Sequence, residues 1–248
     1  VNTHIIEGLT VGKTYTLIEE IAPEGHVKAT EIKFTIEDTA EIQKVKMVDK
    51  IVEMTKIDIA GEEIEGAKII VYDKDKNIID EWISEKMPHR IRNLVEGETY
   101  ILHEEIAVEG FVKATDIEFT VTTNKDIQQV TMVDKIVEMS KVDFGGNEIE
   151  GAKIIVYDKE KNVIDEWISS NEPHKINNLI EGETYILHEE YAPDGFTIAT
   201  DIEFTVGLEK ETQKIEMIDK VVEMTKVDIA GKEIEGAELK VYDKNGEI

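Results

Sequence analysis

Hydrophobic and polar residues alternate with a period of two along most of this chain. The pattern is clear in residues 136–142, 185–189 and 201–206, which are also rich in β-branched side chains. Because successive side chains of a strand point to opposite faces, this period is typical of strands buried on one face. Glycine-containing turns separate the segments at a spacing typical of a β-sandwich or barrel. We therefore predict an all-β fold and no helix.

An internal repeat organises these segments. The sequence of Glu63–Asp73 recurs without change at Glu148–Asp158, an offset of 85 residues, and recurs with small changes at Glu233–Asp243. A second block, Glu96–Glu105, recurs at Glu181–Glu190 with the same offset. No insertion or deletion disturbs the period, so each repeat should be one folding unit.

The phase of the repeat predicts the domain organisation. We expect the C-terminal part of a first repeat at 1–50, complete repeats at 51–135 and 136–220, and the N-terminal part of a further repeat at 221–248. The chain begins and ends within a repeat, which suggests a window cut from a longer array. No linker rich in Pro, Gly or Ser separates the units, so a stiff linear array of tandem sandwiches is expected.

The alternation also places charged residues on the inward faces of three strands per unit. Each inward stripe, such as Val137, Met139 and then Lys141, ends in one ionisable residue. Burial of an unpaired charge is costly, so these positions need a reason. The residues concerned are Lys56, Glu104 and Asp134 in the first complete unit, and Lys141, Glu189 and Asp219 in the second.

Two interpretations of these residues remain open on the alternation alone. In the first, they form buried ion pairs, or they lie at strand ends and reach water. In the second, they react: a desolvated lysine amine is the nucleophile, one carboxyl is the electrophile, and the other carboxyl transfers protons. The product of the second would be a Lys–Asp amide.

Several motifs carry a family resemblance. They are Thr-Lys-x-Asp at Thr55–Asp58, Glu-Glu-Tyr-Ala-Pro-Asp-Gly-Phe at Glu189–Phe196, Ala-Thr-Asp-Ile-Glu-Phe-Thr-Val at Ala199–Val206, and Met-Ile-Asp-Lys at Met217–Lys220. In this order and repeated, they resemble the CnaB/SpaA-type domains of Gram-positive adhesins and pilins, which are prealbumin-like, immunoglobulin-like β-sandwiches. The Glu-Trp-Ile-Ser segment at Glu81–Ser84 is similar to the module behind the SpyCatcher and SpyTag pair. The resemblance extends over the whole chain.

The resemblance implies an intramolecular isopeptide bond in each unit, between the first-strand lysine and the last-strand aspartate, assisted by the middle glutamate. It also implies a structural stalk or fibre segment, and a reaction that occurs once per unit rather than an enzyme with turnover. Many relatives use Asn where this chain has Asp, so water rather than ammonia would leave. Val108 replaces the proline of the Ala-Pro-Asp-Gly turn. The implied bonds are Lys56 to Asp134 with Glu104, and Lys141 to Asp219 with Glu189.

Each end fragment holds only part of the set of lysine, glutamate and aspartate. Glu19 and Asp49 lack a preceding lysine strand, and Lys226 lacks both carboxyl partners. In one interpretation, the fragments belong to a longer array. In the other, residues 221–248 of one chain complete residues 1–50 of the next, which would place Lys226 against Asp49 between chains and build a fibre by strand complementation.

The composition of the chain limits which partners and which cellular location are possible. The net charge of −27 disfavours nucleic acid and anionic membranes, and no apolar run is long enough to span a bilayer. The absence of cysteine excludes disulfides and thiolate metal sites, and the histidines lie singly, so no metal and no cofactor are expected. We expect an extracellular, cell-surface location, with anchoring to the cell wall through a part outside this chain.

Two other functions compete with the crosslinked stalk. One is an adhesin binding module whose repeated acidic loops face a host or matrix protein. The other is a non-covalent scaffold of sandwiches with ion triads. Neighbouring repeats of the same protein are the expected partners in every case, with head-to-tail self-assembly as an extension.

Overall fold

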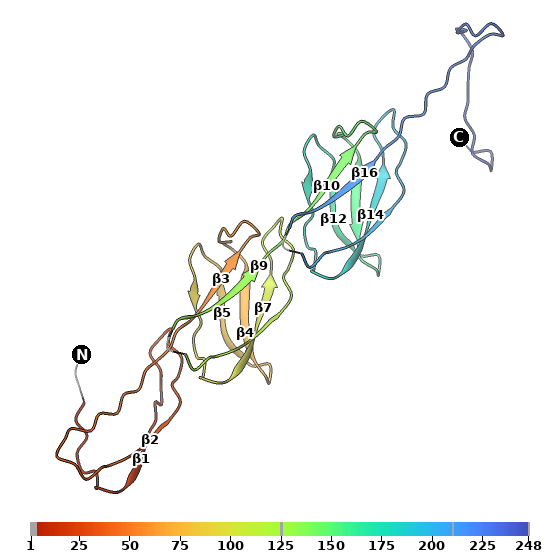
Figure 1. The fold of residues 1–248 in the computed structure, drawn as a ribbon. Coiled ribbons are helices and arrows are strands. Elements are labelled where there is room, and N and C mark those ends of the chain that lie inside the picture. The colour runs from red at the N-terminus through yellow and green to blue at the C-terminus, as the bar shows by residue number, and fades with distance from the viewer. Residues whose placement is uncertain (1–3, 125, 210, 248) are drawn as a thin grey trace.

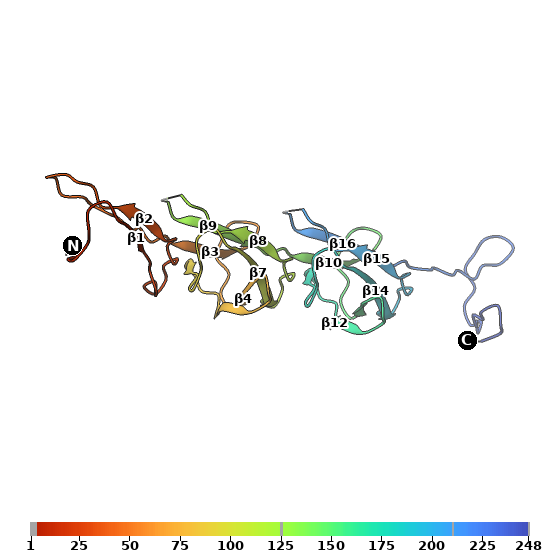
Figure 2. The same ribbon diagram turned by 90° about the horizontal axis from the view of Figure 1, so that it is seen from below.

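The chain forms two similar β-sandwich units in a row, flanked by two less regular end segments (Figure 1). The computed structural model describes residues 4–124, 126–209 and 211–247. The units follow one another along a single axis, and the two chain ends lie at opposite ends of the array (Figure 2). The described residues contain strands and no helix, which confirms the predicted all-β sandwich fold.

Seven strands build the first unit, and they form two sheets. One sheet has the order β6-β3-β9 and the other has the order β5-β4-β7-β8. The strands are β3 (Val52–Ile57), β4 (Lys68–Asp73), β5 (Ile78–Ile83), β6 (His89–Arg90), β7 (Thr99–Ile106), β8 (Ile117–Thr120) and β9 (Gln128–Val133).

The second unit repeats this arrangement 85 positions later. Its sheets have the orders β13-β10-β16 and β12-β11-β14-β15. The strands are β10 (Val137–Val142), β11 (Lys153–Tyr157), β12 (Val163–Ile168), β13 (His174–Lys175), β14 (Thr184–Tyr191), β15 (Ile202–Thr205) and β16 (Gln213–Ile218).

The first and last strands of each unit run parallel, side by side. In the first unit β3 pairs with β9, and Lys56 lies opposite Met132. The other pairs within the two sheets are antiparallel. Because the strands of a parallel pair run in the same direction, their C-terminal ends meet at one end of the sandwich. This topology brings the end of the first strand to the end of the last.

The core of each unit lies between its two sheets, and it is built from the inward positions of the alternating strands. Met54, Ile69, Leu102 and Met132 are fully buried in the first unit. Its core cluster also includes Val27, which belongs to the preceding segment. The core of one unit is therefore completed by a residue from the unit before it.

The two end segments carry little regular structure. Residues 4–50 form one antiparallel hairpin of β1 (Thr14–Leu17) and β2 (Ile32–Thr35). No strand is present in the described residues from 221 to 247, and their side chains are exposed. In the described part of the chain, no helix is long and apolar enough to cross a membrane.

Candidate functional site: a lysine and two carboxyl groups in each core

The parallel pairing of β3 and β9 determines where Lys56 and Asp134 meet. Asp134 follows β9 and lies two positions beyond Met132, which is the partner of Lys56 in the register. Residues two apart in a strand share a face, so both side chains enter the same side of the core. The Nζ atom of Lys56 contacts the Oδ1 atom of Asp134 directly.

Glu104 approaches the same point from the opposite sheet. It lies in β7, paired with Ile69 of β4, and points into the core. The distance between its Oε1 atom and Lys56 Nζ is 2.8 Å. Its Oε2 atom accepts a hydrogen bond of 2.7 Å from the backbone N–H of Ala114, which fixes the orientation of the carboxyl group.

Burial of this group is almost complete. The residues Lys56, Glu104 and Asp134 are 3%, 0% and 0% exposed. Burial disfavours a charged carboxylate, and it raises the pKa of Asp134 to about 7, against a lowering effect of Lys56 and a further raising effect of Glu104. The site therefore favours the neutral, protonated form of the aspartate far more than water does.

Two carboxyl oxygen atoms at the site bear on its protonation state. Among the described residues, Glu104 Oε1 and Asp134 Oδ2 are buried and have no hydrogen-bond partner, although Oε1 is within ion-pair distance of Lys56 Nζ. An unsatisfied pair of buried carboxyl oxygens is costly when both groups are charged. One proton shared between the two groups would satisfy both atoms.

The second unit reproduces the arrangement. Lys141 lies opposite Met217 in the parallel pair, and its Nζ atom contacts Asp219 Oδ1. Glu189 Oε1 is 3.0 Å from the same Nζ atom, and Glu189 Oε2 accepts a bond of 2.6 Å from the N–H of Ala199. Burial raises the pKa of Asp219 above its ordinary value.

The end-segment residues are not assembled into such a site. Glu19 Oε2 accepts a bond of 2.8 Å from the N–H of Ala29, so this glutamate has the same local support as Glu104. Lys226 is exposed and belongs to the C-terminal end segment, whereas Asp49 belongs to the N-terminal one. Their pairing between chains stays a prediction. In the described residues, no group of three or more His, Cys, Asp or Glu side chains could hold a metal ion.

The two complete units are tandem β-sandwich domains, and each has a lysine and two carboxyl groups in its core. The family described as the SpaA prealbumin-like fold domain matches residues 50–136 and 135–221. These matches cover more than half of the chain, and the chain belongs to this family. The family match establishes the prealbumin-like fold of both complete repeats.

Solved structures with a similar fold include two pilins and one further bacterial protein. A shaft pilin SpaA from Lactobacillus rhamnosus GG is 11% identical, with 71% of this chain and 98% of that chain covered and a TM-score of 0.34. A streptococcal ancillary pilin is 16% identical, with 83% and 74% covered and a TM-score of 0.34. The Bacillus anthracis TIE protein is 21% identical, with 84% and 42% covered and a TM-score of 0.29. No curated protein matches the chain.

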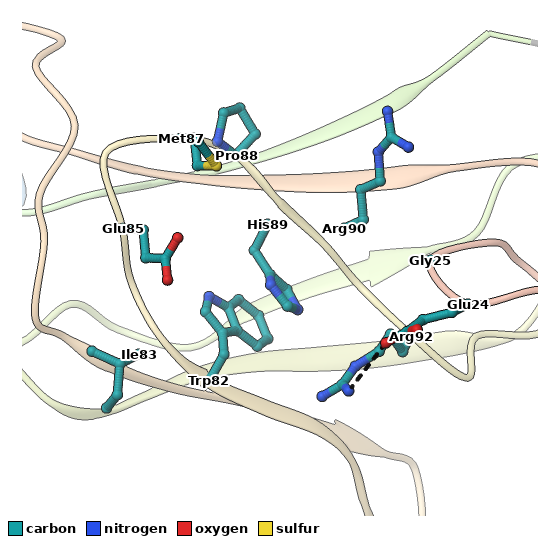
Figure 3. Close-up of a pocket in the computed structure, with 10 residues that line it drawn as sticks. All are labelled: Glu24, Gly25, Trp82, Ile83, Glu85, Met87, Pro88, His89, Arg90 and Arg92. Atoms are coloured by element: carbon teal, nitrogen blue, oxygen red, sulfur yellow. Dashed lines mark ion pairs between the residues drawn. The ribbon is translucent and has the colours of Figure 1, made fainter.

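The alternation pattern missed one further buried acid, Asp80 in β5. Its carboxylate accepts hydrogen bonds from His89 Nε2 at 2.9 Å and from the backbone N–H of Arg92 at 2.9 Å, and it pairs with the Arg92 guanidinium at 2.6 Å. His89 stacks on Trp82 with ring centroids 4.0 Å apart. Figure 3 shows Trp82, His89 and Arg92 at a cavity of about 550 Å³, which Glu24 of the preceding segment also lines.

We expect Asp80→Ala to destabilise the first unit by about 1–2 kcal/mol, because it removes a buried carboxylate that accepts hydrogen bonds from His89 and Arg92, although both of these side chains are partly exposed and can still reach water. Burial alone would raise the pKa of Asp80, but the bonds from His89 and Arg92 outweigh it and hold that pKa below its ordinary value. The stabilisation is therefore present above the ordinary carboxyl range and is lost as the pH falls through the lowered pKa.

Urea unfolding followed by Trp82 fluorescence in a Trp167→Phe background measures the effect of Asp80→Ala. The matched control is Asp165→Ala, followed by Trp167 in a Trp82→Phe background. Asp165 bonds to His174 and Asn177, and no arginine occupies its surroundings, so its loss should cost less. Equal losses in the two units would contradict the importance assigned to Arg92.

Proposed function

We propose that each complete unit closes its own core with an isopeptide bond, Lys56 to Asp134 and Lys141 to Asp219, and that the crosslinked units form a stalk segment of an extracellular surface protein. The observation that carries the proposal is the direct contact between each lysine Nζ and its aspartate inside a buried core. A glutamate from the facing sheet lies beside each contact.

The chemistry follows from the positions of the atoms. The neutral amine of Lys56 attacks Cγ of Asp134, and a new N–C bond forms. The reacting Asp134 is the neutral acid, with its proton on Oδ2. Glu104 accepts a proton from Nζ and passes one to this same oxygen, which then leaves as water when the C–O bond breaks. Contact in a rigid core supplies the proximity that two groups in solution lack.

The bond would give the stalk mechanical strength. It ties the first strand of a unit to the end of its last strand, and the chain enters and leaves the unit through these two strands. Tension along the array would therefore pass through the amide and leave the sandwich intact. The non-covalent scaffold differs only in lacking this amide, and the same experiments separate the two.

Peptide mapping tests the proposed bonds. Trypsin should fail to cleave after Lys56 and Lys141, because an acylated lysine is no longer a cationic substrate side chain. Tandem mass spectrometry should then find branched peptides that join the Lys56 segment to the Asp134 segment, and the Lys141 segment to the Asp219 segment. Linear peptides that end at Lys56 and Lys141 would refute the crosslinks and leave the non-covalent scaffold.

A further inference from the structure

The junctions between successive units are built by repeated contacts that no sequence motif revealed. Only three residues, 134 to 136, separate strand β9 from strand β10. Domains joined by so short a link move relative to one another unless side contacts hold them. In this chain, residues from both sides of the junction make such contacts.

An apolar plug forms the first part of each junction. Val112 belongs to the upstream unit but lies in the core cluster of the downstream unit, where it is 1% exposed. Val27 occupies the equivalent position one repeat earlier, also 1% exposed. The backbone next to Val112 also bonds across the junction, because the N–H of Lys113 donates to the carbonyl of Leu179 at 2.9 Å.

A carboxylate forms the second part. Glu181 of the downstream unit accepts two hydrogen bonds at Oε2 from upstream Thr115, from the backbone N–H at 3.2 Å and from the hydroxyl at 2.9 Å. Its Oε1 atom contacts Lys135 Nζ. Lys135 also donates to the carbonyl of Gly207 at 3.2 Å, so it holds the downstream unit at two points.

The same contacts occur at the preceding junction. Glu96 accepts from the backbone N–H of Thr30 at 3.4 Å and from its hydroxyl at 3.0 Å, and it contacts Lys50 Nζ. Lys50 donates to the carbonyl of Thr122 at 3.1 Å. Charge-assisted hydrogen bonds of this kind are stronger than neutral ones. All of these positions are offset by 85 residues from those of the second junction.

One contact differs between the junctions. The backbone N–H of Gly110 donates to Asn177 Oδ1 at 2.7 Å. Gly110 has a φ of 83°, which favours glycine, and an added Cβ there would lie 3.5 Å from Lys175 Cδ. Arg92 replaces Asn177 one repeat earlier; it pairs with Asp80 and lies 3.9 Å from Glu24 of the preceding segment. The valine plug and the carboxylate contacts are therefore the features that both junctions share.

We propose that Glu96 and Glu181 fix the orientation of each unit relative to the unit before it. Each glutamate is the centre of a socket on its own unit, and the preceding unit binds in this socket through its threonine and lysine. The socket recognises a Thr N–H and hydroxyl together with a lysine ammonium, while the valine plug fills the adjacent core. The role of the socket rests on the proposed stalk function, since a stalk needs fixed angles between its domains as well as strong domains.

Distance measurements between spin labels test the socket in the full chain. The chain has no cysteine, so Lys74→Cys and Lys159→Cys place one label on an exposed turn of each unit. The unaltered junction should give a narrow distance distribution. Glu181→Ala removes the acceptor of three donors and should broaden the distribution by about twofold. Lys135→Met removes the other side of the ion pair and should also broaden it.

Glu183→Ala is the matched control, because Glu183 lies exposed in the same turn. It should leave the distribution narrow. Distributions for Glu181→Ala and Lys135→Met as narrow as that of the control would overturn the socket. Intact mass of the same samples reports the crosslinks separately: a full sequence mass with a broadened distribution would refute the isopeptide bonds and leave the socket standing.

Discussion

The purified chain is expected to be lighter than its sequence mass by two water molecules. Each amide between a lysine and an aspartate releases one water, and the structure holds two complete sets of reacting groups. Lys56→Met should regain one water, because the nucleophile of the first unit is gone while an apolar side chain of similar length fills its place. Lys141→Met should do the same for the second unit, and the double variant should have the full sequence mass.

Lys86→Met is the control for this series. The Lys86 side chain is 76% exposed and lies far from either core, so its removal should leave both water losses in place. Denatured samples give the same masses if the bonds are covalent, whereas an ion pair dissociates when the chain unfolds. An unaltered chain with its full sequence mass would end the isopeptide proposal for both units.

The fold and the central residues could be predicted because they depend on periodicity. Alternation in a strand fixes which residues face inward, so the inward positions of Lys56, Glu104 and Asp134 follow from local sequence. The repeat doubles the evidence, since each pattern occurs again 85 residues later. The family match then confirms the prealbumin-like fold.

The junctions could not be predicted in this way, because their contacts join residues of different repeats. Glu181 belongs to a block that reads as an ordinary polar turn, and its partners Thr115 and Lys135 lie 66 and 46 residues away. Asp80 was missed for a similar reason. It lies on a strand with few inward-facing residues, and the partners that stabilise its carboxylate, His89 and Arg92, follow the next turn of the chain. Only the three-dimensional structure brings these groups together.

Glu104→Gln should block or slow the crosslink of the first unit while leaving its shape unchanged. The amide oxygen of glutamine can still accept the N–H of Ala114, but the amide cannot transfer a proton. Loss of a positioned general acid and base typically slows a reaction by about 10²–10⁴-fold. The variant should therefore regain one water soon after synthesis, as measured by intact mass, and Glu189→Gln should behave alike in the second unit.

The stability of this variant separates the covalent and ionic interpretations. If the triad is ionic, one ammonium faces two carboxylates, and Glu104→Gln removes an excess negative charge, so the unit should be as stable as before or more stable. If the triad is crosslinked, the variant loses a bond between residues 78 apart, and the free energy of unfolding should fall by roughly 4–5 kcal/mol. Urea unfolding of the first unit, followed by Trp82 in a Trp167→Phe background, gives the sign. A gain in stability, with the unaltered chain and the variant both at their full sequence masses, would establish an ion triad and exclude the bond. A loss of stability with one water regained is the result expected of a crosslinked stalk.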